Sequence, residues 1–280
     1  RRQRQMCIRD RLTALQQQGW EVDLLDIQRD GTIDLEQLGD LLRKDTILVS
    51  VCAVDSELGT VQPIRQITEI LKDFPNCRLH VDATQAIGKT ELVMDGVDTM
   101  SIAPHKFYGL NGSGLLLKKS SLIIEPQTHG GSSTTPYRSG TPALALAVSI
   151  EKALQLTLTQ QEERIRYVRQ LNEYLKTALL HYPSVRINSP EGAVPHILNL
   201  SVQGLKGTVF QRVLSERGVC VSVKSACSAE GTPSKAVFAV SGDRKNALSS
   251  WRVSLSHLTT REELDEFLQV FDQCYKELVP

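Results

Sequence analysis

The chain has 280 residues, of which 41% are hydrophobic, and it balances 32 basic side chains against 32 acidic ones. This hydrophobic share is enough for packed cores and excludes a disordered or fibrous protein. A formal net charge of zero gives no general attraction for nucleic acid or anionic lipid, and no apolar run approaches the roughly 18 residues of a membrane span. We therefore expect a small molecule or another protein as partner, with no direct nucleic-acid contact and no membrane.

The first eleven residues differ in composition from the rest of the chain. Residues 1–11 hold five of the 32 basic side chains but only one acidic residue, without the apolar stretch of a secretory signal. We interpret 1–11 as a foreign or artefactual tail, with a basic arm as the alternative. The default location is then a reducing cytoplasm, where the six scattered cysteines predict neither a disulfide framework nor a metal site.

Short apolar runs alternate with helical patterns over residues 12–158. We expect strands at 46–54, 78–83, 100–103 and 114–117, and a helix that Pro63 opens. The uncharged, β-branched run at 46–54 is typical of a strand buried on both faces. Strand, helix and strand at this spacing predict a βαβ unit, and hence an α/β domain with a mostly parallel sheet.

Long helices mark the second half of the chain. One is expected over 142–156, a second begins at a capping box of Thr159 with Glu162, and the last begins at a capping box of Thr260 with Glu263. Strands are expected at 197–202, 219–223 and 251–255, and Cys220 falls inside the middle one, which predicts a core position. Residues 159–280 are therefore expected to form a smaller α+β domain.

Two residues that follow predicted strands could carry chemistry. Asp82 ends the strand in L-H-V-D, and Lys106 follows the next strand in S-I-A-P-H-K. Ligands of open α/β sheets bind at these carboxyl ends, although Asp82 could also be a helix cap and Lys106 a surface lysine. Together they suit pyridoxal 5′-phosphate, because a partly buried lysine can form an imine with its aldehyde while an aspartate pairs with its ring nitrogen.

A series of motifs makes the hypothesis specific. In chain order these motifs are H-V-D-A-T-Q-A-I-G-K, A-P-H-K-F-Y-G-L-N-G-S-G-L-L, H-G-G with Y-R-S-G-T-P, S-A-C-S, and S-S-W-R-V-S-L-S-H-L-T-T. The series closely resembles that of the cysteine desulfurases, in the class V aminotransferase group of fold-type I pyridoxal-phosphate enzymes. The resemblance runs from about residue 12 to residue 278. It implies that 12–158 is a large cofactor-binding domain, incomplete at its N-terminus, and that 159–280 is the small C-terminal domain.

The resemblance also assigns the cofactor site. It implies that Lys106 holds pyridoxal 5′-phosphate, that Asp82 pairs with the ring nitrogen and that Gln85 contacts the phenolic oxygen. His105 would lie beside the phosphate. Thr141 matches a residue that reaches the phosphate of the neighbouring subunit's cofactor, which implies a homodimer.

Substrate binding and sulfur transfer follow from the same resemblance. Arg252 matches the arginine that clamps the α-carboxylate of L-cysteine, a role that suits its planar fork of donors. Cys227 would attack the substrate's sulfur, leaving a persulfide on the protein and free alanine, and Lys224 is close enough in sequence to favour its thiolate. The persulfide would then pass to an acceptor protein, either an iron–sulfur scaffold or a tRNA thiolation enzyme.

Three departures from the family keep other interpretations open. Ala103 replaces a serine that binds the cofactor phosphate, Ser56 stands where an asparagine touches cofactor and substrate, and the family's N-terminal region has no counterpart in the sequence. The alternatives are a related class V lyase or aminotransferase, such as a selenocysteine lyase, and a non-catalytic protein that retains the fold. The first alternative predicts that the activity does not depend on Cys227, and the second predicts that no cofactor binds.

Overall fold

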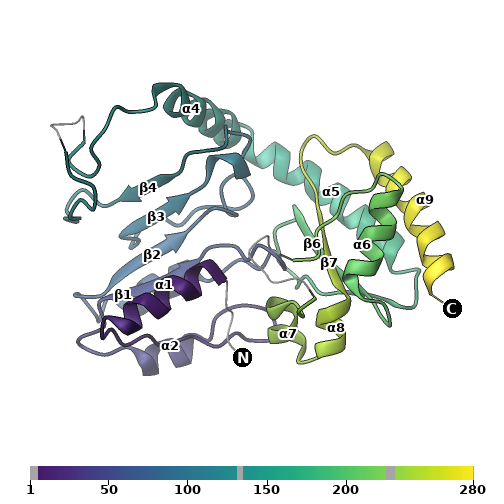
Figure 1. Ribbon diagram of the computed structural model, residues 1–280, viewed down its shortest axis with the longest axis horizontal. Coiled ribbons are helices and arrows are strands. Elements are labelled where there is room, and N and C mark those ends of the chain that lie inside the picture. Colours follow the sequence, from purple (N-terminus) through teal and green to yellow (C-terminus); the bar gives the residue numbers. More distant parts are fainter. Residues whose placement is uncertain (1–5, 131–134, 225–230, 280) are drawn as a thin grey trace. The chain divides into compact units, whose positions relative to one another are not determined.

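The computed structural model describes residues 6–130, 135–224 and 231–279, which form two compact units (Figure 1). The parallel-sheet unit consists of residues 43–53 and 64–161. The antiparallel-sheet unit consists of residues up to 42, of 54–63 and of 162–280. Residues 54–63, between the first strand and the helix after it, therefore belong with the C-terminal half of the chain. The assignment of 12–158 and 159–280 to two functional domains stays a prediction.

The parallel-sheet unit is built on four strands in the order β1-β2-β3-β4, with β1, β2 and β3 parallel and β4 antiparallel to β3. The strands are β1 (Leu48–Cys52), β2 (Arg78–Asp82), β3 (Thr99–Ile102) and β4 (Leu115–Lys118). Helix α3 (Ile64–Leu71) makes the crossover from β1 to β2, and α4 (Leu144–Thr159) ends the unit. This arrangement confirms the predicted α/β class with a mostly parallel sheet.

Strand β1 differs from its prediction in one respect. Val49 and Val51 are buried, but Ser50 is exposed and Leu48 is 53% exposed, so only one face of the strand is covered. β1 is also the edge strand of the described order and pairs with β2 alone. An uncharged run predicts a strand well but does not tell how many of its faces are covered.

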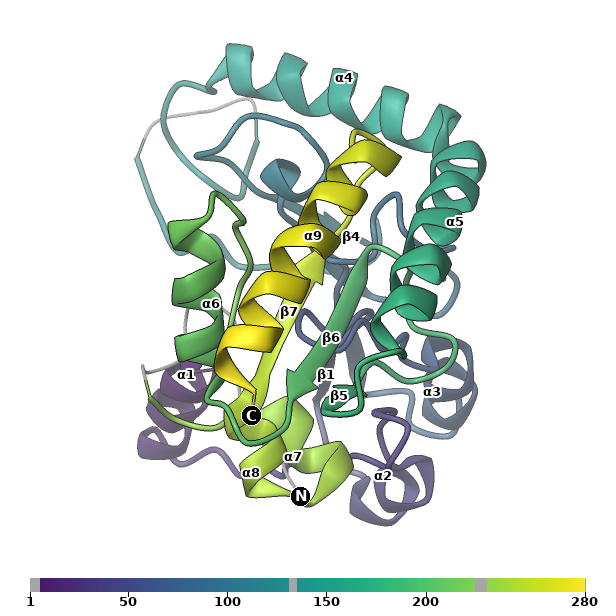
Figure 2. The ribbon, with the colours of Figure 1, turned by 90° about the vertical axis from the view of Figure 1, so that its right-hand side faces the viewer.

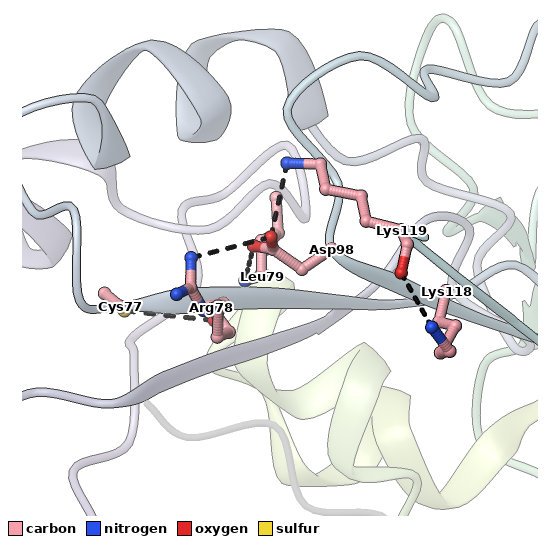
Figure 3. A network of polar contacts seen from close by, with 6 residues as sticks. All are labelled: Cys77, Arg78, Leu79, Asp98, Lys118 and Lys119. Atoms are coloured by element: carbon pink, nitrogen blue, oxygen red, sulfur yellow. Dashed lines mark hydrogen bonds and ion pairs between the residues drawn. The ribbon is translucent and has the colours of Figure 1, made fainter. Parts of the chain in front are cut away.

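A buried carboxylate ties the start of β2 to the strand beside it (Figure 3). Asp98, 7% exposed, accepts a hydrogen bond at Oδ2 from the backbone N–H of Leu79 at 2.8 Å. Its Oδ1 lies 3.2 Å from the Nζ of Lys119 and 3.9 Å from Nη1 of Arg78. Buried charges of this kind persist when they are paired and hydrogen-bonded. The network therefore fixes the register of β2, whose other end carries Asp82.

The antiparallel-sheet unit has three strands, β5 (Val185–Ile187), β6 (Ile197–Val202) and β7 (Ser250–Ser254), in that order. Figure 2 shows α5 (Gln161–Leu179), α6 (Gly207–Glu216) and α9 (Arg261–Leu278) on one side of this sheet. Their apolar faces enclose a core that includes Trp251, stacked on Phe210 with ring centroids 5.5 Å apart. The shorter helices are α1 (Met6–Gln17), α2 (Leu35–Leu41), α7 (Lys235–Ser241) and α8 (Arg244–Ser249).

One of the two predicted capping boxes forms. Thr260 caps α9 by accepting from the N–H of Glu263, whose carboxylate accepts from the N–H of Thr260, and this confirms the prediction. Thr159 instead belongs to α4, and its hydroxyl donates to the carbonyl of Gln155 at 2.7 Å. The predicted box with Glu162 is therefore wrong, because α4 runs through the residue expected to start the next helix.

The predicted strand at 219–223 is also wrong. Within it, only Ser222 pairs in a bridge, with Arg252, and Cys220 is exposed rather than in the core. Gly218, at φ +81°, turns the chain just before this segment. Among the described residues, no helix is long and apolar enough to cross a membrane.

Candidate functional site

Asp82 lies at the carboxyl end of β2, between β1 and β3. It stands opposite Cys52 on one side and Ser101 on the other, and its carboxylate is half-buried. Its Oδ1 accepts from the N–H of Thr84 at 2.9 Å, so the side chain also shapes the turn that follows the strand. The predicted site carboxylate is therefore held by the strand and the turn together.

Gln85 follows in the same turn and is held by Lys89. The Nζ of Lys89 donates to the Oε1 of Gln85 at 2.7 Å. An ammonium group can only donate, so it must face the oxygen of the amide, and the NH₂ group forms the other end of the Gln85 side chain. That end suits an acceptor such as a phenolic oxygen.

Lys106 and His105 lie in the short helix η1 (Pro104–Lys106) that follows β3. Because β2 and β3 are parallel neighbours, Asp82 and Lys106 come from adjacent strand ends, as predicted. Both η1 side chains are exposed, so the expected partial burial of Lys106 is wrong: a single surface turn presents it.

The residues after η1 are strained in a way that fixes its position. Tyr108 has φ +72°, a backbone conformation that costs a bulky residue on the order of 1–3 kcal/mol. Gly109 leaves no room for a side chain, because an added Cβ would lie 2.8 Å from the Cβ of Pro104. Such strain is typical of functional turns and holds the Lys106 backbone in one place.

His80 is a neighbour of Asp82 that sequence reasoning missed. Its Nδ1 lies 2.8 Å from Oγ1 of Thr99, and its Nε2 lies 3.4 Å from Oγ of Ser101. Burial lowers the pKa of His80, against the opposing effect of the negative charge of Asp82. The signal was present in the sequence, since positions 80 and 82 of one strand point to the same face of the sheet.

In the parallel-sheet unit, a carboxylate, an amide and a primary amine thus lie at one edge of the sheet. The carboxylate can accept from a protonated ring nitrogen, the amide can donate to a phenolic oxygen, and the amine can form an imine with an aldehyde. These are the partners that pyridoxal 5′-phosphate requires. Ala103 offers no hydroxyl to a phosphate, and it caps η1 without a side-chain hydrogen bond.

The structure brings Ser56 and Arg252 together in the antiparallel-sheet unit. Nη1 of Arg252, on β7, donates to the carbonyl oxygen of Ser56 at 2.5 Å. The contact is made by the backbone of Ser56 and not by its hydroxyl. Burial lowers the pKa of Arg252, while the charges of Glu57 and Asp55 act in the opposite direction. A partly buried guanidinium, with its planar fork of donors, suits a ligand carboxylate.

Two predicted site residues remain to be placed, Thr141 and Cys227. Thr141 is exposed in the segment before α4, and Cys227 lies outside the described residues. Lys224, which was expected to favour the Cys227 thiolate, donates to the carbonyl and hydroxyl oxygens of Thr232 at 2.9 and 3.0 Å. Its ammonium group is therefore engaged with the chain on the other side of Cys227.

Comparison with known proteins agrees with this geometry. The family described as "Aminotransferase class-V" matches residues 11–267. A "NifS/IcsS protein homolog" of Lactobacillus delbrueckii subsp. bulgaricus is 36% identical over 270 residues, which cover 94% of this chain and 70% of that protein. A "Cysteine desulfurase IscS" of Dictyoglomus turgidum is 33% identical, with 94% and 68% covered.

Solved structures give the same result. A "NIFS-LIKE PROTEIN" superposes with a TM-score of 0.88 at 30% identity, covering 95% of this chain and 71% of that one. A second, "SspA in complex with cysteine", superposes with a TM-score of 0.76 at 27% identity, covering 91% and 72%. The chain therefore shares its fold with these proteins over nearly all of its own length and about 70% of theirs.

Proposed function

The chain belongs to the aminotransferase class-V family, and from that premise we propose that it is a pyridoxal 5′-phosphate-dependent cysteine desulfurase. The observation that carries the proposal is the placement of Asp82 and Lys106 at the carboxyl ends of adjacent parallel strands. Relatives that are 31–36% identical over most of the chain bear the name cysteine desulfurase or NifS/IcsS homolog, and the solved relative with bound cysteine supports L-cysteine as substrate.

In this proposal the parallel-sheet unit holds the cofactor. Lys106 would bind its aldehyde carbon, Asp82 would keep its ring nitrogen protonated, and Gln85 would donate from its NH₂ group to the phenolic oxygen. His105 would lie beside the phosphate, and Thr141 would reach the phosphate in a partner subunit of a homodimer. When bound, the cofactor accepts electrons from the substrate's Cα and so weakens the bonds next to it.

The remaining residues act on L-cysteine. Arg252 would bind the α-carboxylate, with the Ser56 carbonyl holding its other edge. The thiolate of Cys227 would then form an S–S bond to the substrate's sulfur as the C–S bond breaks. The electron pair of that bond stays with carbon, which takes up a proton, so free alanine leaves and a persulfide remains on Cys227.

A persulfide on Cys227 can be passed to any acceptor thiol that reaches it, so we propose an acceptor protein of iron–sulfur cluster assembly or of tRNA thiolation. A homodimer and a cytoplasmic location complete the proposal.

Purified protein incubated with pyridoxal 5′-phosphate and L-cysteine tests it. We expect alanine and an equal amount of persulfide, and a visible absorption band from the covalent link to Lys106. Lys106→Ala should abolish the band and Cys227→Ala the persulfide. The matched controls, Lys44→Ala and Cys220→Ala, replace an exposed lysine and an exposed cysteine and should change neither.

The other outcomes decide between the alternatives. Alanine production that survives Cys227→Ala would indicate a related class V lyase, such as a selenocysteine lyase. Absence of the absorption band would indicate a protein that retains the fold without the chemistry, an interpretation that Ala103 and Ser56 favour.

A further inference from the structure

A buried acidic turn supports the arginine of the antiparallel-sheet unit. The turn spans residues 54–61, is closed by an antiparallel bridge between Val54 and Val61, and buries Asp55 (3% exposed) and Glu57 (8% exposed). Oδ1 of Asp55 accepts from the N–H groups of Glu57 and Leu58 at 2.9 and 2.6 Å. The backbone of the turn is therefore determined by one of its own carboxylates.

The acidic turn is fixed to the rest of its unit at a second point. The carbonyl of Gly59 accepts from the N–H of Val194 at 2.9 Å. Gly59 has φ +78°, and an added Cβ would lie 3.1 Å from the Cβ of Ile197 on β6, so the backbone lies close against the sheet. Leu58 packs in a small buried cluster with residues of α7 and α8. These contacts leave the turn little freedom to shift.

Glu57 is in turn held by the N-terminus of α7. Oγ of Ser234, 1% exposed, donates to Oε2 of Glu57 at 2.6 Å and accepts from the N–H of Val237 at 3.1 Å. One hydroxyl thus caps a helix and orients a carboxylate 177 residues away in sequence. A hydrogen bond to a charged acceptor in a buried place is among the stronger polar contacts of a protein.

Arg252 is the cation beside this turn. Its backbone N–H donates to Ser222 at 2.6 Å, its Nη1 donates to Ser56 within the turn, and its Nε is buried without a hydrogen-bond partner among the described residues. Burying a guanidinium is costly unless negative charge lies nearby. The structure provides that charge in Glu57 and Asp55, which favour the protonated arginine against the effect of burial.

We propose that Glu57 is a positioning residue for Arg252, which it holds charged and in place so that the guanidinium donors not taken by the Ser56 carbonyl can face a ligand's carboxylate. Ser234 fixes Glu57, and Asp55 shapes the turn so that the Ser56 carbonyl takes only one edge of the guanidinium. The proposal rests on the proposed function in one respect, namely that the ligand carboxylate is that of the substrate amino acid.

The arrangement differs from an ordinary surface ion pair. In the pair of Arg217 with Glu277, the two charged groups meet directly at 2.6 Å, with side chains 33% and 56% exposed. Glu57 instead accepts a hydrogen bond from Ser234, and Arg252 donates to the Ser56 carbonyl beside it. A nearby carboxylate can stabilise the charge of an arginine while the guanidinium N–H groups hydrogen-bond to the carboxylate of a ligand.

Nuclear magnetic resonance of arginine side chains tests the positioning without cofactor. The Nε–H signal of Arg252, assigned by its loss in Arg252→Lys, reports its environment and its exchange with water. We expect Glu57→Gln to shift this signal and to speed its exchange about tenfold, as for the loss of one charged contact. Ser234→Ala should act in the same direction but less. The matched control, Glu277→Gln, should shift the signal of Arg217 and leave that of Arg252 unchanged.

Circular dichroism and the melting temperature show whether each variant is folded. A folded Glu57→Gln with an unchanged Arg252 signal would overturn the proposal. If Glu57→Gln does not fold, Ser234→Ala decides instead, and an unchanged signal there overturns it as well.

A separate titration with L-alanine tests the premise. A shift of the Arg252 Nε–H signal on addition of this amino acid supports the carboxylate site, and its absence argues against that part of the proposed function. Positioning by Glu57 is judged from the ligand-free spectra alone, so the two failures are distinguishable.

Discussion

Replacing Asp98 should loosen the parallel sheet at the start of β2 more than any surface charge does. Asp98→Asn keeps an acceptor for the N–H of Leu79 but removes the charge that faces Lys119 and Arg78. Asp98→Ala removes the acceptor too, and leaves the N–H of the fully buried Leu79 without its partner. The two variants therefore separate the contribution of the charge from that of the hydrogen bond.

The magnitudes follow from the geometry. A hydrogen bond to a charged group contributes about 1 kcal/mol more than a neutral one, and the half-exposed Lys119 adds roughly 0.5–1 kcal/mol. At 3.9 Å, Arg78 adds little. We expect Asp98→Asn to cost about 2 kcal/mol, and Asp98→Ala about 3–4 kcal/mol because an unsatisfied buried donor adds about 1–3 kcal/mol.

Hydrogen exchange of the β2 amides measures this locally, which matters because a chain of two units need not unfold in one step. The matched control is Glu69→Gln, which removes the carboxylate that Lys72 contacts at 2.6 Å on the exposed surface of the same unit. That variant should leave β2 exchange unchanged. Equal exchange in Asp98→Asn and Glu69→Gln would refute the reasoning, since burial would then make no difference to the value of a carboxylate.

Three further predictions concern single side chains. Burial lowers the pKa of His80, so as the pH falls below about 6.5 the unfolded chain takes up this proton before the folded chain does. The stability of the parallel-sheet unit should therefore fall below that pH, and it should fall less in His80→Gln. The pH dependence of hydrogen exchange in β2 measures this stability. Thr260→Ala should cost the last helix about 1 kcal/mol in urea unfolding, whereas Thr159→Ala, which removes no cap, should cost less. Gly109→Ala should displace η1 and weaken the absorption band of the bound cofactor, whereas Gly114→Ala, with an ordinary contact of 3.6 Å, should not.

The fold could be predicted from the sequence where one segment determines its own structure. The four strands of the parallel sheet and the cap of α9 follow from apolar runs and from a threonine and glutamate at the right spacing. The same capping pattern did not predict a helix start at Thr159, because α4 continues through that residue. Where α4 ends depends on how the helix packs, and the local sequence does not show this. The run at 219–223 failed because a strand needs a partner along its length, and this segment has one only at Ser222.

The candidate functional residues of the two units differ in the same way in how far they could be predicted. Asp82 and Lys106 could be found because strand ends are visible in the sequence and neighbouring parallel strands end at one edge. The contact of Arg252 with Ser56 joins positions 196 residues apart through a backbone carbonyl, which carries no side-chain signal. Glu57 was missed for a different reason: its partner Ser234 lies 177 residues away in sequence, and neither residue belongs to a motif of its own.

The chain path explains why the residues of the two units were not equally visible in the sequence. The connection from β1 to α3 would be an ordinary loop in a βαβ unit, yet residues 54–63 belong to the antiparallel-sheet unit. Gly59 lies against Ile197 of β6, Glu57 accepts from Ser234 at the start of α7, and the Ser56 carbonyl accepts from Arg252. The residues of this loop are therefore determined by its contacts within the antiparallel-sheet unit and not by the strand before it. Substitutions in this turn should therefore change the arginine site while leaving the Asp82 and Lys106 edge as it is.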